Sequence, residues 1–138
     1  MRALVQRVTR AAVSVDGEEI AAIGPGMLVL LGVRDGDDED AADRLARKLR
    51  ALRIFEDADG RMNDPLGERE VLCVSQFTLY GDTAKGNRPS FGRAARPEAA
   101  APLYERVRDS LGGKGGVFGA RMVVELVGDG PVTLLVEV

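Results

Sequence analysis

The side chains best suited to chemistry lie together in the run Ser75-Gln76-Phe77-Thr78, at the end of a short apolar segment. A serine or threonine nucleophile needs a base within hydrogen-bond reach, and histidine is the usual base at neutral pH. The chain has no histidine, and no Gly-x-Ser-x-Gly pattern surrounds Ser75. Lys85 could act as a base only if desolvated, yet its loop sequence indicates exposure. The spacing disfavours a conventional serine hydrolase, and the hydroxyls could simply satisfy backbone groups at a strand end.

Other nucleophilic or metal-binding patterns are weaker. Cys73 lies inside the apolar run and is expected to be a buried core thiol. One cysteine and no histidine leave only carboxylates for a metal, and 35–40 lacks the calcium-loop pattern. The glycine-rich 112–116 lacks the full phosphate-loop signature. We therefore predict no metal site and no cofactor.

Cations crowd the segment 85–96, which includes Lys85 and Arg88, although the whole chain has a net charge of −3. An acidic total argues against a general nucleic-acid coat protein, whereas a local basic loop can still hold a phosphate backbone. The alternative is that these charges only keep one face solvated. Glycine, proline and asparagine make the segment irregular, so it is expected to be a long surface loop.

The elements that must position these residues can be read from the apolar pattern. Strands are expected over 1–15 and 18–23, joined by an Asp16-Gly17 turn, and a buried strand over 27–33. Val71 to Val74 is another short buried strand leading into Ser75. Segments 121–127 and 132–138 are expected to be two strands joined through Gly130-Pro131, for which a plain hairpin turn is favoured.

Two helices are expected between the strand groups. The first follows the acidic segment 35–40, with Ala42, Leu45, Leu49 and Leu52 at helical spacing. The second begins at Pro97 and ends at Gly112-Gly113. The sequence therefore predicts an α/β fold: a compact, mixed and mostly antiparallel sheet with two main helices in a single domain, 1–138. The absence of a signal-like or membrane-length apolar segment, with one cysteine, favours the cytoplasm.

Four segments together resemble the D-aminoacyl-tRNA deacylase family (D-Tyr-tRNA deacylases). They are 1–8, 75–79, 85–91 and 130–133, reading Met-Arg-Ala-Leu-Val-Gln-Arg-Val, Ser-Gln-Phe-Thr-Leu, Lys-Gly-Asn-Arg-Pro-Ser-Phe and Gly-Pro-Val-Thr. The resemblance covers essentially the whole chain in the same order. It implies a barrel-like α/β homodimer with both active sites at the interface, lined by Ser75, Gln76, Phe77 and Thr78.

The resemblance also implies specific roles outside that run. Gly130-Pro131, with a cis peptide bond, would enter the partner's pocket as a chiral gate, with Arg7 also at the substrate site. Lys85 and Arg88 are expected to contact tRNA, because their loop directly follows the pocket strand; the other basic stretch, 44–53, stays an alternative. The family usually has asparagine two residues before the glycine of the gate, and here that position is Gly128, which removes one anchor for the loop.

The function implied is hydrolysis of the ester bond of D-aminoacyl-tRNA, with rejection of L-aminoacyl-tRNA. Backbone N–H groups near Phe77 and Thr78 could stabilise the oxyanion, and the substrate's ribose 2′-OH could help activate water. A backbone gate would not exclude glycine, so glycyl-tRNA(Ala) is an expected second substrate. Two alternatives stay open: a non-catalytic nucleic-acid-binding module on the same fold, and a small-molecule esterase with Ser75 or Thr78 as nucleophile.

Overall fold

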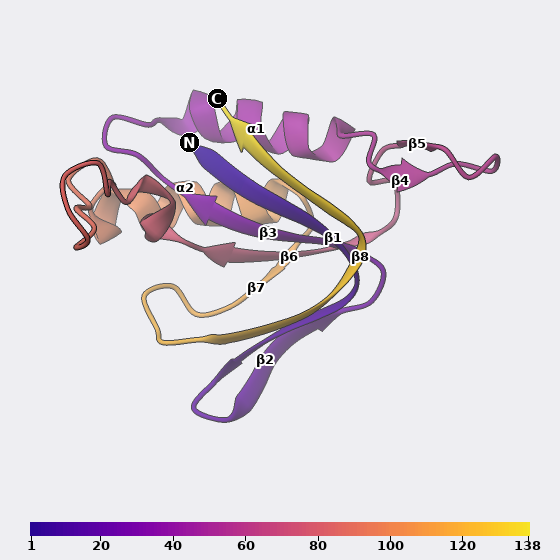
Figure 1. The fold of residues 1–138 in the computed structure, drawn as a ribbon, viewed down its shortest axis with the longest axis horizontal. Helices are drawn as coiled ribbons and strands as arrows, with labels where there is room; N and C mark the ends of the chain where they lie inside the picture. The colour runs from indigo at the N-terminus through magenta and orange to yellow at the C-terminus, as the bar shows by residue number, and fades with distance from the viewer.

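A strongly curved sheet carries both long helices on one face (Figure 1). The computed structural model describes residues 1–138. The strands are β1 (Arg2–Val15), β2 (Glu18–Ile23), β3 (Gly26–Gly32), β4 (Phe55–Glu56), β5 (Met62–Asp64), β6 (Glu70–Ser75), β7 (Lys114–Gly115) and β8 (Val123–Glu137). The helices are α1 (Glu39–Ala51), the short 3₁₀ helix η1 (Phe77–Tyr80) and α2 (Pro97–Ser110).

β1 organises the sheet because it is long enough to pair with three neighbours. It runs antiparallel to β2, β3 and β8, while β3 and β6, and then β6 and β7, pair in parallel. The Nζ atom of Lys114 lies 2.9 Å from the carbonyl oxygen of Ala22 and 2.9 Å from a carboxylate oxygen of Glu70, linking β7 to the end of β2. The sheet is thus mixed, mostly antiparallel and nearly closed, as predicted.

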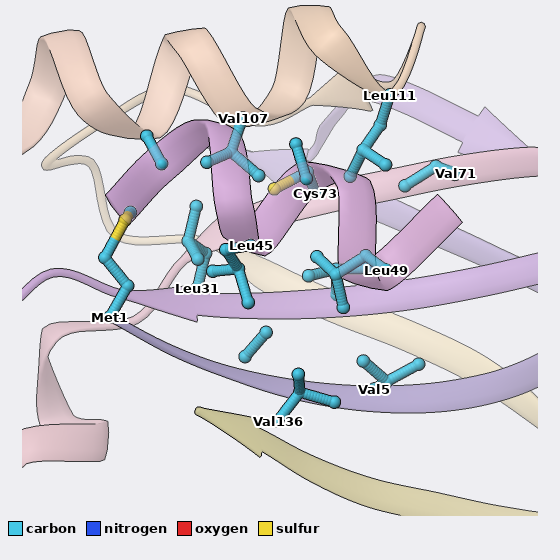
Figure 2. Close-up of a cluster of buried hydrophobic side chains, with 14 of the residues drawn as sticks. Met1, Val5, Leu31, Leu45, Leu49, Val71, Cys73, Val107, Leu111 and Val136 are labelled. Atoms are coloured by element: carbon cyan, nitrogen blue, oxygen red, sulfur yellow. The ribbon is translucent and has the colours of Figure 1, made fainter. Parts of the chain in front are cut away.

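The main core lies between the helices and the sheet (Figure 2). Leu45 and Leu49 of α1 and Val107 of α2 are fully buried against strand residues such as Leu31 and Cys73. A second cluster fills the inner curve of the sheet, on the opposite face of the same strands. Alternation along β6 assigns Val71 and Cys73 to the helix face and Leu72 and Val74 to the inner face.

Both helices begin and end close to where the sequence predicts. The side chain of Asp38 accepts a hydrogen bond of 2.9 Å from the backbone N–H of Ala41 and so caps α1. α2 begins with Pro97, whose missing N–H costs nothing in the first turn. No helix is long and apolar enough to cross a membrane.

The expected pair of C-terminal strands is wrong in one respect. β8 is continuous from Val123 to Glu137, and both of its halves pair with β1. A hairpin would fold the second half back onto the first, whereas here β1 is long enough to serve as neighbour to both. Gly130-Pro131 falls at an irregularity in this pairing, between Val8 opposite Gly128 and Gln6 opposite Thr133.

Candidate active site

The run Ser75-Gln76-Phe77-Thr78 lies where the chain leaves β6 and turns into η1. The backbone N–H of Gln76 donates to the carbonyl of Leu31 at 2.7 Å, which ties the turn to β3. At the other end of η1, the guanidinium of Arg2 donates to the carbonyl of Leu79 at 2.9 Å. The short helix is therefore held from both sides by the sheet.

The backbone N–H groups of Phe77 and Thr78 have no acceptor within the chain. They are the first residues of η1, and the first N–H groups of a helix have no partner inside it. The Ser75 hydroxyl, half-buried beside them, also makes no hydrogen bond within the chain. Free donors in a fixed turn are the arrangement that stabilises negative charge developing on a substrate oxygen.

The side chains at the site do not assemble an activated nucleophile. The amide nitrogen of Gln76 donates to the hydroxyl of Thr78, the only hydrogen bond of that hydroxyl. Burial raises the pKa of Cys73 to about 12 and that of Tyr104 to about 12. Both groups therefore stay protonated at neutral pH, so neither is a base or nucleophile there.

A mostly apolar cavity of about 620 Å³ opens beside this turn. Ser75, Gln76 and Phe77 form one wall of it. The facing wall comes from α2 and from the segment before β8, through residues that include Tyr104 and Phe118. The volume suits a small organic group such as an aminoacyl ester or a nucleoside.

Sequence reasoning missed the facing wall of the cavity. Tyr104 is 2% exposed, and its hydroxyl donates to the carbonyl of Cys73 at 2.8 Å, so its ring closes the inner end beside β6. The centroid of the Phe118 ring lies 5.8 Å from that of Tyr104. The chain has only two tyrosines, four phenylalanines and no tryptophan. This small number of aromatic residues was the available signal for the cavity wall, because only a few rings in the chain could line a cavity.

The basic loop borders the mouth of the cavity. Two backbone hydrogen bonds join Asp82 and Ser90, at 2.8 and 2.9 Å, and close the loop on itself. Its far end is attached to the segment after β3, where the N–H of Ala95 donates to the carbonyl of Val33 at 3.0 Å. Lys85 and Arg88 are exposed.

Gly130 and Pro131 lie elsewhere, exposed in the middle of β8, with a cis peptide bond between them. Arg7 holds the backbone next to them: its Nε donates to the carbonyl of Asp129 at 3.1 Å and its Nη1 to the carbonyl of Ile54 at 2.7 Å. Arg7 is the only charged residue that is buried as a whole, 6% exposed. Arg7 therefore anchors this part of the β8 backbone, where Gly128 has no side chain that could do so.

The structure does not bring the two groups of predicted site residues together within one chain. Ser75 pairs with Leu31 and so lies level with Ala3, whereas Gly130-Pro131 lies beside Arg7, four residues further along β1. Three strand spacings separate β6 from β8. At about 3.3 Å per residue and 4.8 Å per strand, the separation along the sheet is roughly 20 Å.

Comparison with known proteins gives a consistent result along the whole chain. The family model described as D-Tyr-tRNA(Tyr) deacylase matches residues 4–137. Curated proteins named D-aminoacyl-tRNA deacylase from Symbiobacterium thermophilum and Anaeromyxobacter dehalogenans are 56% and 58% identical. Each alignment covers 99% of this chain, and 95% and 97% of the respective relative.

Two solved structures are also similar. One, named "c-Myc DNA Unwinding Element Binding Protein", has a TM-score of 0.94 and 42% identity, covering 100% of this chain and 99% of that one. The other is described as a probable eukaryotic D-amino acid tRNA deacylase. Its TM-score is 0.83 and its sequence identity is 20%. The alignment covers 99% of this chain and 98% of that one, and at this identity the similarity shows only a shared fold.

Proposed function

Because the chain belongs to the D-Tyr-tRNA(Tyr) deacylase family and is a hydrolase of D-aminoacyl-tRNA, we propose that two copies of it build each active site. One copy supplies the cavity and the η1 turn, and its partner supplies Gly130-Pro131. The observation that carries this proposal is the separation of roughly 20 Å between the two groups along one sheet. Because Gly130-Pro131 is exposed in the middle of β8 and lies that far along the sheet from its own cavity, we expect it to enter the cavity of a second copy.

The exposed apolar side chains of β8 support a contact between copies. Val123, Val127 and Leu135 are 65%, 50% and 54% exposed, although each lies in a paired strand. Exposed apolar residues on both faces of a paired strand are typical of a surface that another protein covers. A two-fold contact would place the same strand of both copies at the interface, so each Gly130-Pro131 could enter the other's cavity.

Hydrolysis at this site relies on backbone groups and on the substrate. A water oxygen attacks the carbonyl carbon of the aminoacyl ester, and the carbonyl oxygen becomes negative. The N–H groups of Phe77 and Thr78 donate to that oxygen, a stabilisation worth about 2.7–4 kcal/mol per donor in known cases. The ester C–O bond then breaks, the attacking water's proton passes to the departing ribose oxygen, and the ribose 2′-OH helps to orient the water.

Gly130-Pro131 acts in this account as a rigid chiral gate. The partner's backbone carbonyls there accept hydrogen bonds from the substrate α-ammonium group, and the rigid backbone leaves no room for a side chain of L configuration. Shape discrimination by side chains alone gives about 1–3 kcal/mol per methylene-sized difference. A fixed wall instead rejects one enantiomer whatever its side chain, and Arg7 keeps that wall in place.

The tRNA acceptor end approaches over the basic loop, where Lys85 and Arg88 contact phosphates. These two cations lie in the segment that borders the mouth of the cavity. Each phosphate contact adds to the salt dependence of binding without distinguishing sequences. We place this reaction in the cytoplasm, where aminoacyl-tRNA is used.

The direct test compares D-Tyr-tRNA with L-Tyr-tRNA at equal enzyme. The account predicts rapid release of D-tyrosine and little release of L-tyrosine. Release of neither would contradict the deacylase function. It would favour a nucleic-acid-binding module instead, the role that the name of one similar protein, a DNA unwinding element binding protein, describes. Equal release of both would contradict the gate.

Glycyl-tRNA(Ala) supplies a second test of the gate. Glycine has no side chain to collide with Gly130-Pro131, so a backbone gate should hydrolyse this ester as well. The measurement is glycine release as enzyme is raised over several orders of magnitude. Complete resistance at the highest enzyme concentration would show that something other than backbone exclusion selects the substrate.

A further inference from the structure

Two exposed phenylalanine rings form an edge-to-face pair at the mouth of the cavity. Phe77 is 56% exposed and Phe91 is 38% exposed, and their ring centroids lie 4.9 Å apart with planes at 68°. Both line the opening of the cavity. Phe55 is buried by contrast, and Phe118 is half-buried. Exposed aromatic rings beside a cavity are typical of a surface that binds a ligand.

The ring of Phe91 is fixed in place before any ligand arrives. It packs against the backbone of Gly81, where a Cβ atom would lie 3.1 Å from the ring carbon Cε1. The residue before it, Ser90, is tied to Asp82 by two backbone hydrogen bonds, and the carbonyl of Phe91 accepts from the N–H of Ala94 at 3.0 Å. A ring held this way loses little freedom when a ligand stacks on it.

Unpaired cations lie in the same segment as Phe91. The segment 81–97 carries Lys85, Arg88, Arg93 and Arg96 and one acid, Asp82, giving +3 in a chain of net charge −3. All four cations are exposed, and none of their side chains makes an ion pair or hydrogen bond within the chain. A symmetric contact centred here would bring two sets of like charges together, so a polyanion fits this surface better than a second copy.

We propose that the Phe77–Phe91 pair is a stacking platform for the nucleobase next to the aminoacylated 3′-terminal nucleotide. This inference rests on the proposed function, because the ester in the cavity fixes where the preceding nucleotide must lie. Unpaired bases of single-stranded RNA stack on aromatic side chains, while neighbouring cations take the phosphates. The platform thus holds the strand just outside the cavity and binds whichever base is there.

The test compares D-tyrosyl esters of adenosine, of the dinucleotide cytidylyl-adenosine and of full tRNA. The variants are Phe91→Leu, which keeps an apolar side chain without a π-face, and Phe91→Tyr, which keeps the face. In the wild type, kcat/KM should rise from adenosine to the dinucleotide. Phe91→Leu should reduce that rise by about tenfold, the lower part of the range for base stacking, and Phe91→Tyr should preserve it.

Several results would overturn the platform. One is an equal loss with all three esters, which would make Phe91 only a wall of the cavity. Another is dissociation of Phe91→Leu into monomers on size exclusion, which would make the pair part of the contact between copies. If Phe91→Leu does not fold, Phe91→Met carries the same prediction, because methionine keeps a long apolar side chain without a π-face. Wild-type enzyme inactive on every D-ester would instead refute the proposed function itself.

Discussion

Replacement of Arg7 by methionine should weaken both the fold and the proposed chiral gate. Methionine keeps an unbranched apolar stem in the space of the buried arginine but removes the guanidinium. The carbonyls of Ile54 and Asp129 then lose donors that lie 2.7 and 3.1 Å away. The lost hydrogen bond at Ile54 should lower the free energy of unfolding by its full cost, because it is buried. The hydrogen bond to Asp129 is only partly buried, so its loss should cost less.

The expected cost follows from these contacts. An unsatisfied buried backbone group costs about 1–3 kcal/mol, and two such groups of unequal burial suggest about 3 kcal/mol in total. The ion pair between Arg7 and the carboxylate of Asp129 adds less than about 1 kcal/mol, because that carboxylate is 49% exposed and screened by solvent. With an m-value of about 2 kcal/mol/M, the urea midpoint should fall by about 1.5 M.

The assay is urea unfolding at one fixed protein concentration, since association between copies would add to apparent stability. Arg10→Met is the matched control, because Arg10 lies on the same strand, is exposed and makes no ion pair. The selectivity for D-Tyr-tRNA over L-Tyr-tRNA should fall in Arg7→Met and not in Arg10→Met. A stability loss below about 0.5 kcal/mol with unchanged selectivity would show that Arg7 anchors neither the fold nor Gly130-Pro131.

Three further predictions concern the site and the sheet. Thr78→Ala should keep at least about a tenth of wild-type kcat with D-Tyr-tRNA, because the proposed mechanism uses backbone N–H groups and not the Thr78 hydroxyl; a loss of several thousandfold would indicate a covalent nucleophile. Hydrogen bonds from the N–H of Gly24 and then from Lys114 lower the pKa of Glu70 from its ordinary value of 4.5. The stability that Glu70 adds is therefore present above about pH 4.5 and is lost as pH falls through the lowered pKa. The difference in free energy of unfolding between wild type and Glu70→Gln should shrink in acid. An equal difference at about pH 7 and pH 3 would contradict this. A Cβ at Gly26 would lie 1.9 Å from the carbonyl oxygen of Glu70, so Gly26→Ala should cost at least about 3 kcal/mol in thermal unfolding, while Gly24→Ala, with 3.5 Å to its nearest atom, should cost far less.

The sequence was sufficient for the elements that strong local signals define. The helical spacing of Leu45 and Leu49, the acidic segment 35–40 and the first-turn Pro97 all predicted helices that the structure contains. The turn at Asp16-Gly17 has the two positive φ angles that its sequence indicates. Such features depend on residues close together in the chain, so local chemistry alone determines them.

What the sequence could not reveal depends on distant neighbours. The halves of β8 look like two strands because Gly130-Pro131 interrupts the apolar pattern, and only the length of β1 makes them one. The cavity wall at Tyr104 is hidden for the same reason, since its hydroxyl partner is a carbonyl of β6, 31 residues earlier. The roles of Arg7 and of Gly130-Pro131 at the substrate stay predictions.

The central claim, a site shared between two copies, can be tested by mixing two defective chains. Ala120→Trp should fill the cavity, and Pro131→Ala should displace the backbone carbonyls that hold the substrate α-ammonium group, so each variant alone should fail to hydrolyse D-Tyr-tRNA. When equal amounts are refolded together, half of the dimers should pair one variant with the other, and each mixed dimer contains one site built from an intact cavity and an intact gate. About a quarter of wild-type activity should therefore be recovered. No recovery above the separate variants, or full activity of Pro131→Ala alone, would contradict it.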